Sequence, residues 1–219
     1  MTGCGDATFG GNYQEATAED VQTFANEAAL AGGSNDIDLA LGYQLIAKMS
    51  FGEGAQAYNM DMDIKFSADN DDGILLTATM KGKVSGQNVN ATMYWADGYA
   101  YVNTEGLKVK ERMEDMGDIY GDLVSAVEGF DLSALAQMAI EDTTIKLGMV
   151  REDNGTTKIK FDMPENSVLV GTIVFVFDAE YDLSAMKFDV TMQGMKLEIT
   201  YKPWNGTVNL PGDLNTYVG

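Results

Sequence analysis

The chain has 219 residues, 45% of them hydrophobic, which is enough for a continuous core in one large domain. Its 14 Lys and Arg residues against 34 Asp and Glu residues leave a net charge of 14 − 34 = −20, and such a surface repels phosphate backbones, so we expect no nucleic-acid partner. Because the sequence has no histidine and one cysteine, it excludes histidine-assisted nucleophiles, an HExxH zinc site and an intrachain disulfide, and we predict no catalytic residue, metal or cofactor.

The N-terminal part of the sequence predicts a tether followed by helices. Residues 1–16 are rich in Gly and polar residues and lack hydrophobic periodicity, which indicates a flexible segment. A helix is predicted next, because Thr17 and Asp20 form a capping-box pattern and apolar residues follow at helical spacing until a Gly-Gly pair ends the run. The same spacing predicts a second helix over 36–48.

From residue 55 the hydrophobic period changes from 3.6 to two. In "YNMDMDIKF" the apolar residues alternate with Asn, Asp and Lys, as in a half-buried strand. Strand patterns continue in "ILLTATMKGKV", in "NATMYW" and "YAYVN" around the turn signal Asp97-Gly98, and in "GLKVKERM". These segments predict consecutive antiparallel strands.

The helical period returns over 115–140, and strand patterns follow it to the end of the chain. The last of them is the short "TVNL" at 207–210, which brings the number of candidate strands to about eleven. Strands joined as hairpins need no crossover helices, so we predict a mainly β (α+β) fold with one large, curved antiparallel sheet and helices covering its concave face. We expect a single domain over 17–219.

Methionine is unusually frequent, with 14 residues, and much of it lies on predicted strands. Its flexible, polarizable side chain suits surfaces that adapt to variable apolar ligands, whereas a packed core favours branched side chains. The predicted ligand-lining residues are Tyr58, Met60, Met62, Ile64, Phe66, Met80, Met93, Met116, Leu123, Met138, Met186 and Met192. A lipid cavity and a filled core both agree with this pattern, and the sequence leaves the two open.

The only cysteine, Cys4, lies in "MTGC" at the start of the sequence. This stretch resembles the end of a bacterial lipobox, in which the cysteine is lipidated and becomes the mature N-terminus. The resemblance implies that Cys4 is a lipidation site and that the segment after it tethers the protein to a membrane. We therefore expect an extracytoplasmic protein, anchored to the outer face of the bacterial cell membrane through its acyl group.

The order of elements carries a second resemblance. An N-terminal helix, Met-rich alternating strands, a "WADGYAYVNTEGLKVKERM" hairpin, a helical insertion and a closing "AMKFDVTMQGMKLEITYKPWNGTVNLP" look like uncharacterised Gram-positive lipoproteins of the LolA/LppX-like group. The resemblance implies a half-barrel of about eleven antiparallel strands whose helices close a cavity for acyl chains. It implies a noncatalytic carrier or binder, with no functional residue that transfers one by one.

These observations predict a monomeric lipoprotein that binds a lipid, a lipidated molecule or another hydrophobic small molecule between the sheet and the helices at 17–48 and 115–140. The alternative is a cell-surface interaction or sensor module with a filled core. An enzyme would require carboxylates, or serine with lysine, to converge in a cleft, which a sequence pattern does not reveal.

Overall fold

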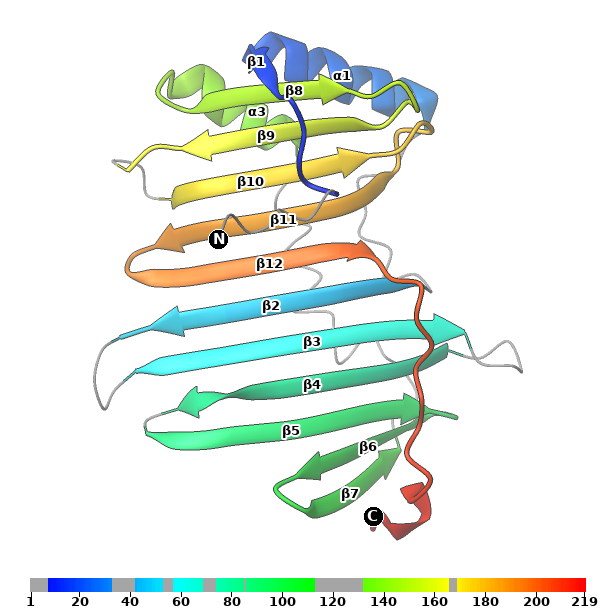
Figure 1. The fold of residues 1–219 in the computed structure, drawn as a ribbon. Coiled ribbons are helices and arrows are strands. Elements are labelled where there is room, and N and C mark those ends of the chain that lie inside the picture. The colour runs from blue at the N-terminus through cyan, green and yellow to red at the C-terminus, as the bar shows by residue number, and fades with distance from the viewer. Residues whose placement is uncertain are drawn as a thin grey trace. The chain divides into compact units, whose positions relative to one another are not determined.

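The computed structural model describes residues 8–32, 42–52, 57–68, 74–84, 86–112, 132–165 and 169–219. Within these ranges the fold is mainly β, with twelve strands and two α-helices (Figure 1). The strands are β1 (Gln14–Ala16), β2 (Tyr43–Phe51), β3 (Tyr58–Ala68), β4 (Ile74–Val84), β5 (Gln87–Ala96), β6 (Tyr99–Thr104), β7 (Leu107–Arg112), β8 (Lys146–Arg151), β9 (Thr157–Met163), β10 (Leu169–Phe177), β11 (Leu183–Met192) and β12 (Met195–Pro203). The helices are α1 (Ala18–Ala31) and α3 (Leu132–Glu141).

The strand order is β1-β8-β9-β10-β11-β12-β2-β3-β4-β5-β6-β7, and over the described residues it does not close into a barrel. This confirms the predicted mainly β class and the large antiparallel sheet. Backbone contacts divide the chain into two compact units. Unit 1 comprises 1–37 and 123–193, and unit 2 comprises 38–122 and 194–219. The expected single domain over 17–219 stays a prediction.

Unit 1 is built on β1 and β8 to β11, with α1 and α3 packed together beside them. Helix α1 begins with the predicted capping box, in which Thr17 and Asp20 exchange hydrogen bonds, and it ends at Gly32, whose φ of 81° suits glycine. Phe24 of α1 is fully buried, with its ring 5.0 Å from that of Phe177 on β10. The helices therefore pack on one face of these strands, over a core of branched and aromatic side chains: Ile159, Phe161, Ile173, Phe175, Phe177 and Phe188.

Residues 8–13 pack on the opposite face of the unit 1 strands, and we call them the N-terminal strap. Phe9 is buried in a cluster with Val174 and Val176, which alternate along β10 with the residues that face the helices. The ammonium of Lys158, itself buried, donates a hydrogen bond of 2.8 Å to the carbonyl oxygen of Gly10. The sequence assigned this stretch to a flexible tether, whereas in the structure Phe9 and the Lys158 hydrogen bond join it to the sheet.

Unit 2 contains β12 and β2 to β7, all antiparallel. The predicted hairpin at Asp97-Gly98 is confirmed, because both turn residues have positive φ between β5 and β6. The prediction of a helix over 36–48 is wrong from residue 43 onward, where the chain forms β2. Leu45 and Ala47 are the buried residues there, and their spacing of two is that of a strand.

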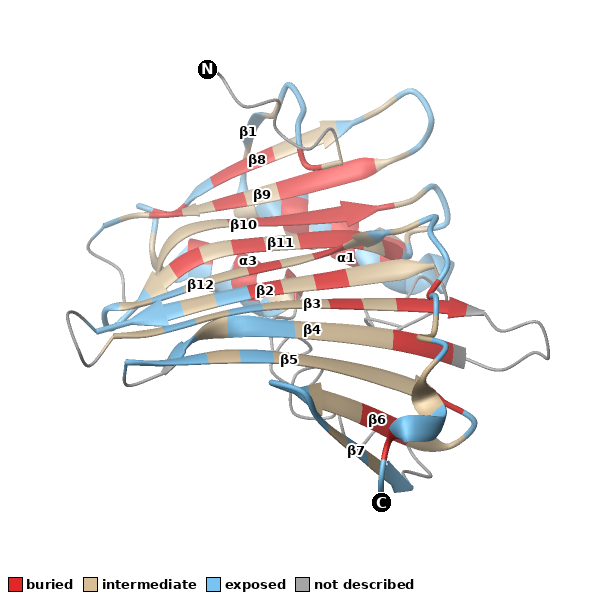
Figure 2. Cartoon of the chain, turned by 60° about the horizontal axis from the view of Figure 1, so that its bottom comes forward, coloured by how far each residue is buried: buried red, intermediate tan, exposed pale blue. Residues whose placement is uncertain are grey.

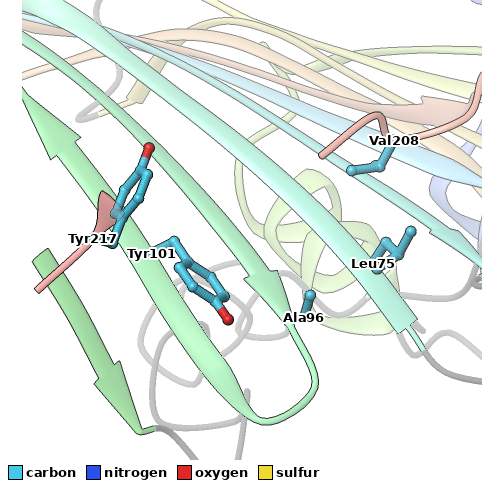
Figure 3. Close-up of a cluster of buried hydrophobic side chains, with 5 residues drawn as sticks. All are labelled: Leu75, Ala96, Tyr101, Val208 and Tyr217. Carbon is cyan, nitrogen blue, oxygen red and sulfur yellow. The ribbon is translucent and has the colours of Figure 1, made fainter. Parts of the chain in front are cut away.

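The chain after β12 crosses one face of unit 2, and we call residues 204–218 the C-terminal strap. Val208 and Tyr217 of this strap are buried against Leu75, Ala96 and Tyr101 of the strands below (Figure 3). The amide of Val208 donates to the Ser67 hydroxyl, and Val218 pairs with Val109 of β7. The predicted strand "TVNL" is therefore wrong: this stretch forms no strand, and its Val208 side chain is buried across the strands.

The remaining differences from the sequence prediction are small. Ten of the eleven candidate strands are confirmed, and β1 and β2 bring the number among the described residues to twelve. Within the predicted helix at 115–140, the structure confirms α3, which runs on to Glu141. The earlier part of that helix, 115–131, lies outside the described residues.

Candidate ligand-binding face

Five methionines lie on one face of four neighbouring strands in unit 2, and we call this surface the methionine face. Across β3 and β4 Met62 is opposite Met80, and across β2 and β3 Met49 is opposite Met60. Met93 of β5 is opposite Ala78 of β4. Alternation along each strand adds further residues to the same face: Tyr43, Leu45, Ala47, Phe51, Tyr58, Ile64, Phe66, Leu76, Ala91 and Trp95.

Burial changes steadily along this face. At one end Phe66 and Leu76 are fully buried, whereas Met80 in the middle is 37% exposed. At the other end Phe51 is 46% exposed, and its ring stacks on that of Tyr58 at 4.9 Å between centroids. Figure 2 shows the same change along β3 and β4, from buried through intermediate to exposed. The methionine face is thus closed at one end and open at the other.

The reverse side of the same strands is polar and partly covered. Asp63 accepts hydrogen bonds from Gln44 at 2.8 Å and from Lys65 at 2.9 Å. The C-terminal strap packs on this side, where its aspartate Asp213 pairs with Lys108. The two sides of the unit 2 strands therefore differ in chemistry, and the apolar side is the one with partly exposed methionines.

The closed end of the methionine face carries one polar group. Trp95 of β5 is opposite Leu76 of β4 and Ala100 of β6, so its ring shares the apolar face. Its indole Nε1 atom is buried and has no hydrogen-bond acceptor among the described residues. Buried indole N–H groups ordinarily find a partner.

The structure divides the predicted ligand-lining residues between the two units. Seven of them share the methionine face: Tyr58, Met60, Met62, Ile64, Phe66, Met80 and Met93. Three belong to unit 1, where Met186 is buried in the core and Met138 and Met192 are 44% and 41% exposed. Met116, Leu123 and the lipidation candidate Cys4 lie outside the described residues.

Sequence reasoning missed the contribution of β2 to this face, and it missed Trp95. The signal for β2 was present in "YQLIAKMSF" (43–51), where Tyr43, Leu45, Ala47, Met49 and Phe51 follow a period of two. Ile46 on the other face blurred this pattern and favoured a helical interpretation. Nothing in the sequence marks Trp95 as different from a core tryptophan.

Unit 1 contains a groove of about 840 Å³ between β1, β8 and the C-terminal end of α3. Its lining is mixed, with Glu15, Lys160 and Asp162 among apolar residues. Burial raises the pKa of Tyr13 on this groove to about 12, and the charges of Glu152 and Asp162 add to the shift. The groove lacks the continuous apolar lining of the methionine face.

Two further observations limit the chemistry of the described residues. They contain no group of three or more Asp, Glu, His or Cys side chains that could hold a metal ion. Neither of the helices that the structure describes has the length and apolarity that a membrane span requires.

Comparison with known proteins finds likeness only among solved structures. No protein-family model and no curated protein matches the chain. LprF from Mycobacterium bovis is similar at 10% identity and a TM-score of 0.36, covering 91% of this chain and 99% of LprF. A domain described as an outer membrane lipoprotein-sorting protein domain, from Vibrio parahaemolyticus, shows 13% identity and a TM-score of 0.28, covering 91% and 98% of the two chains.

A DUF1329 family protein from Desulfovibrio piger shows 7% identity and a TM-score of 0.26, covering 88% of this chain and 95% of the other. Identities and TM-scores this low carry no argument about what the chain binds. The functional assignment therefore depends on the methionine face and its contrast with unit 1.

Proposed function

We propose that the chain is a noncatalytic extracytoplasmic lipoprotein that binds a lipid or lipidated molecule on the methionine face of unit 2. The observation that carries this proposal is the partly exposed middle of this apolar face, where the side chain of Met80 on β4 is 37% exposed to solvent. The proposal includes anchoring to the outer face of the bacterial cell membrane through an acylated Cys4. It agrees with the resemblance of the element order to LolA/LppX-like lipoproteins.

The two units support this proposal by their different use of apolar side chains. Unit 1 covers its strands with α1 and α3 and fills the space with Phe and Ile side chains, of which Phe161 and Ile173 are fully buried. The middle of the methionine face instead combines Met with small residues such as Ala47 and Ala78, although its closed end contains Phe66 and Leu76. Branched and aromatic side chains specify one packing arrangement, whereas Met adapts to several. This difference supports a packed core in unit 1 and an adaptable binding surface in the middle of the methionine face.

Apolar burial supplies the driving force for holding an acyl chain on such a face. Each methylene removed from water contributes about 0.8 kcal/mol, so a chain of about ten methylenes gains about 8 kcal/mol before the costs of association. No covalent step is needed. The two ends of the face differ in burial, with Phe66 and Leu76 at the closed end and Phe51 at the open end.

The first test is native mass spectrometry of the gently purified chain, followed by denaturing extraction of what co-purifies. We expect a discrete mass above the 23.7 kDa of the chain, and we expect the extract to contain an acyl lipid. A bare chain that also takes up no added dioctanoylglycerol would contradict the proposal. It would favour an interaction module with a filled core.

A matched pair of variants tests the location of the site. Met80→Asp places a charge on the methionine face, and Asn90→Asp places the same charge on the reverse side, opposite Lys81. Burial of an unpaired carboxylate under an acyl chain is strongly unfavourable, so Met80→Asp should weaken displacement of the dye N-phenylnaphthylamine by dioctanoylglycerol about tenfold or more. Asn90→Asp should leave it unchanged. Equal effects of both variants, or no effect of Met80→Asp, would place the ligand elsewhere.

A further inference from the structure

Trp95 is the polar feature of the methionine face that the proposed function does not use. The strands around it place only apolar side chains beside the ring on this face, with Leu76 on β4 and Ala100 on β6. Leu76 and Ala100 are both buried, and so is the indole Nε1 atom. A hydrogen-bond donor is thus held at the closed end of an apolar surface, with no acceptor among the described residues.

Such an arrangement is unfavourable in the free protein. A buried N–H without an acceptor loses its hydration and gains nothing in return. A phenylalanine at this position would keep the aromatic surface and remove the unmatched donor. The tryptophan therefore has a physical rationale if an acceptor arrives with the ligand.

The position of Trp95 indicates what kind of acceptor fits. Met93 lies two residues before it on the same face of β5, and this methionine is half-buried beside Ala78. An acyl chain on the methionine face therefore passes within one strand pleat of the indole. A charged head group would be buried there without a counterion, which is unfavourable, whereas a neutral carbonyl oxygen needs only one donor.

We propose that Trp95 donates a hydrogen bond from its indole N–H to the carbonyl oxygen of an ester-linked acyl chain. This inference rests on the proposed function and deepens it, because it names an acyl ester as the ligand class. Alkyl chains without a carbonyl, such as ether lipids, fit the same apolar face but leave the donor unmatched. The site thus selects acyl esters over alkyl ethers of equal length.

The test compares dioctanoylglycerol with its dioctyl ether analogue, which lacks both carbonyl oxygens. The unmodified chain should bind the ester about tenfold more tightly, since one hydrogen bond to an otherwise unmatched donor corresponds to about a tenfold change in affinity. In Trp95→Phe the preference should disappear, while binding of the ether stays unchanged. The matched control is Trp204→Phe, which alters the tryptophan that packs on the reverse side with the C-terminal strap and should keep the preference.

The indole N–H resonances give a second readout that does not depend on a variant. The chain has two tryptophans, so a proton–nitrogen correlation spectrum shows two such signals. The Trp95 signal, assigned by its loss in Trp95→Phe, should move downfield on addition of the ester and much less on addition of the ether.

The outcomes separate this inference from the proposed function. Equal binding of ester and ether, with an unmoved Trp95 signal, would overturn the role of Trp95 and leave the methionine face as an acyl-chain site. Binding of neither lipid would overturn the proposed function itself. A Trp95→Phe variant that binds both lipids poorly would also count against the inference, because the ring and not its N–H would then be the important feature.

Discussion

Two methionines in different units provide a direct test of whether the methionine face is a binding surface or a filled core. Met186 on β11 is 1% exposed, and it lies opposite Phe175 of β10 within the core of unit 1. Met80 on β4 is 37% exposed and lies between Met62 and Ala91. Substitution of each by alanine removes the same atoms, so the difference in cost reports the difference in surroundings.

The expected magnitudes follow from the two environments. Met186→Ala leaves a cavity among aromatic side chains such as Phe175 and Phe188, and substitutions of this kind cost about 2 to 5 kcal/mol of the free energy of unfolding. Met80→Ala removes a side chain that already contacts solvent, so we expect a cost of about 1 kcal/mol or less. Met80→Ala should nevertheless weaken dioctanoylglycerol binding, whereas the folded fraction of Met186→Ala should bind it normally.

The assay is urea unfolding followed by circular dichroism, with hydrogen exchange to assign each loss of stability to unit 1 or unit 2. Lipid binding is measured on the same preparations. A Met80→Ala cost equal to that of Met186→Ala would refute the reasoning, because it would mean that Met80 occupies a filled core. Unchanged lipid binding in Met80→Ala would refute it independently.

The other two predictions concern the N-terminal strap. Lys158→Met removes the hydrogen bond to Gly10 and the 2.8 Å ion pair with Glu152. Amide exchange of residues 8–13 should therefore accelerate, while the global free energy of unfolding changes by only about 1 kcal/mol. Unchanged amide exchange of these residues would show that Phe9 alone holds the strap. The Tyr13 hydroxyl donates to the Phe9 carbonyl, and burial raises the pKa of Tyr13 to about 12. Since this pKa lies above the unfolded value of 10.0, the contribution of Tyr13 to the free energy of unfolding is fully present below pH 10 and is lost as the pH rises through about 12. Tyr13→Phe should abolish this part of the dependence of stability on alkaline pH.

The sequence predicted most strands of this fold because alternation is a local signal. "YNMDMDIKF" alternates cleanly, so both its strand character and its inward residues were readable. The prediction missed β2 because Ile46 lies on the polar side of the sheet, opposite Asp63. This apolar residue turns the alternating pattern of the strand into an apolar run. The prediction missed β1 because a strand of three residues is too short to show a hydrophobic period.

The sequence of a strand does not show which segment packs on it, because the segments that cover a face of the sheet are distant in sequence. Met80 and Met186 look alike in their strands, yet one is open and the other is packed in a core. Phe9 in a Gly-rich segment gave no sign of its cluster with Val174, since that contact spans the chain. The candidate face was therefore predictable as a set of inward residues, but its open middle and the unmatched donor of Trp95 were not.

The packed N-terminal strap limits how far the protein can stand from a membrane. Phe9 is the first buried residue in the part of the chain that the structure describes, and five residue steps separate it from Cys4. An extended chain covers at most about 3.6 Å per residue, so the segment from Cys4 to Phe9 spans at most about 18 Å. With Cys4 acylated as proposed, Phe9 stays within that distance of the lipid head groups. A protein tethered so closely would not carry the proposed ligand across a compartment; it would exchange that ligand with its own bilayer or with partners that come to it.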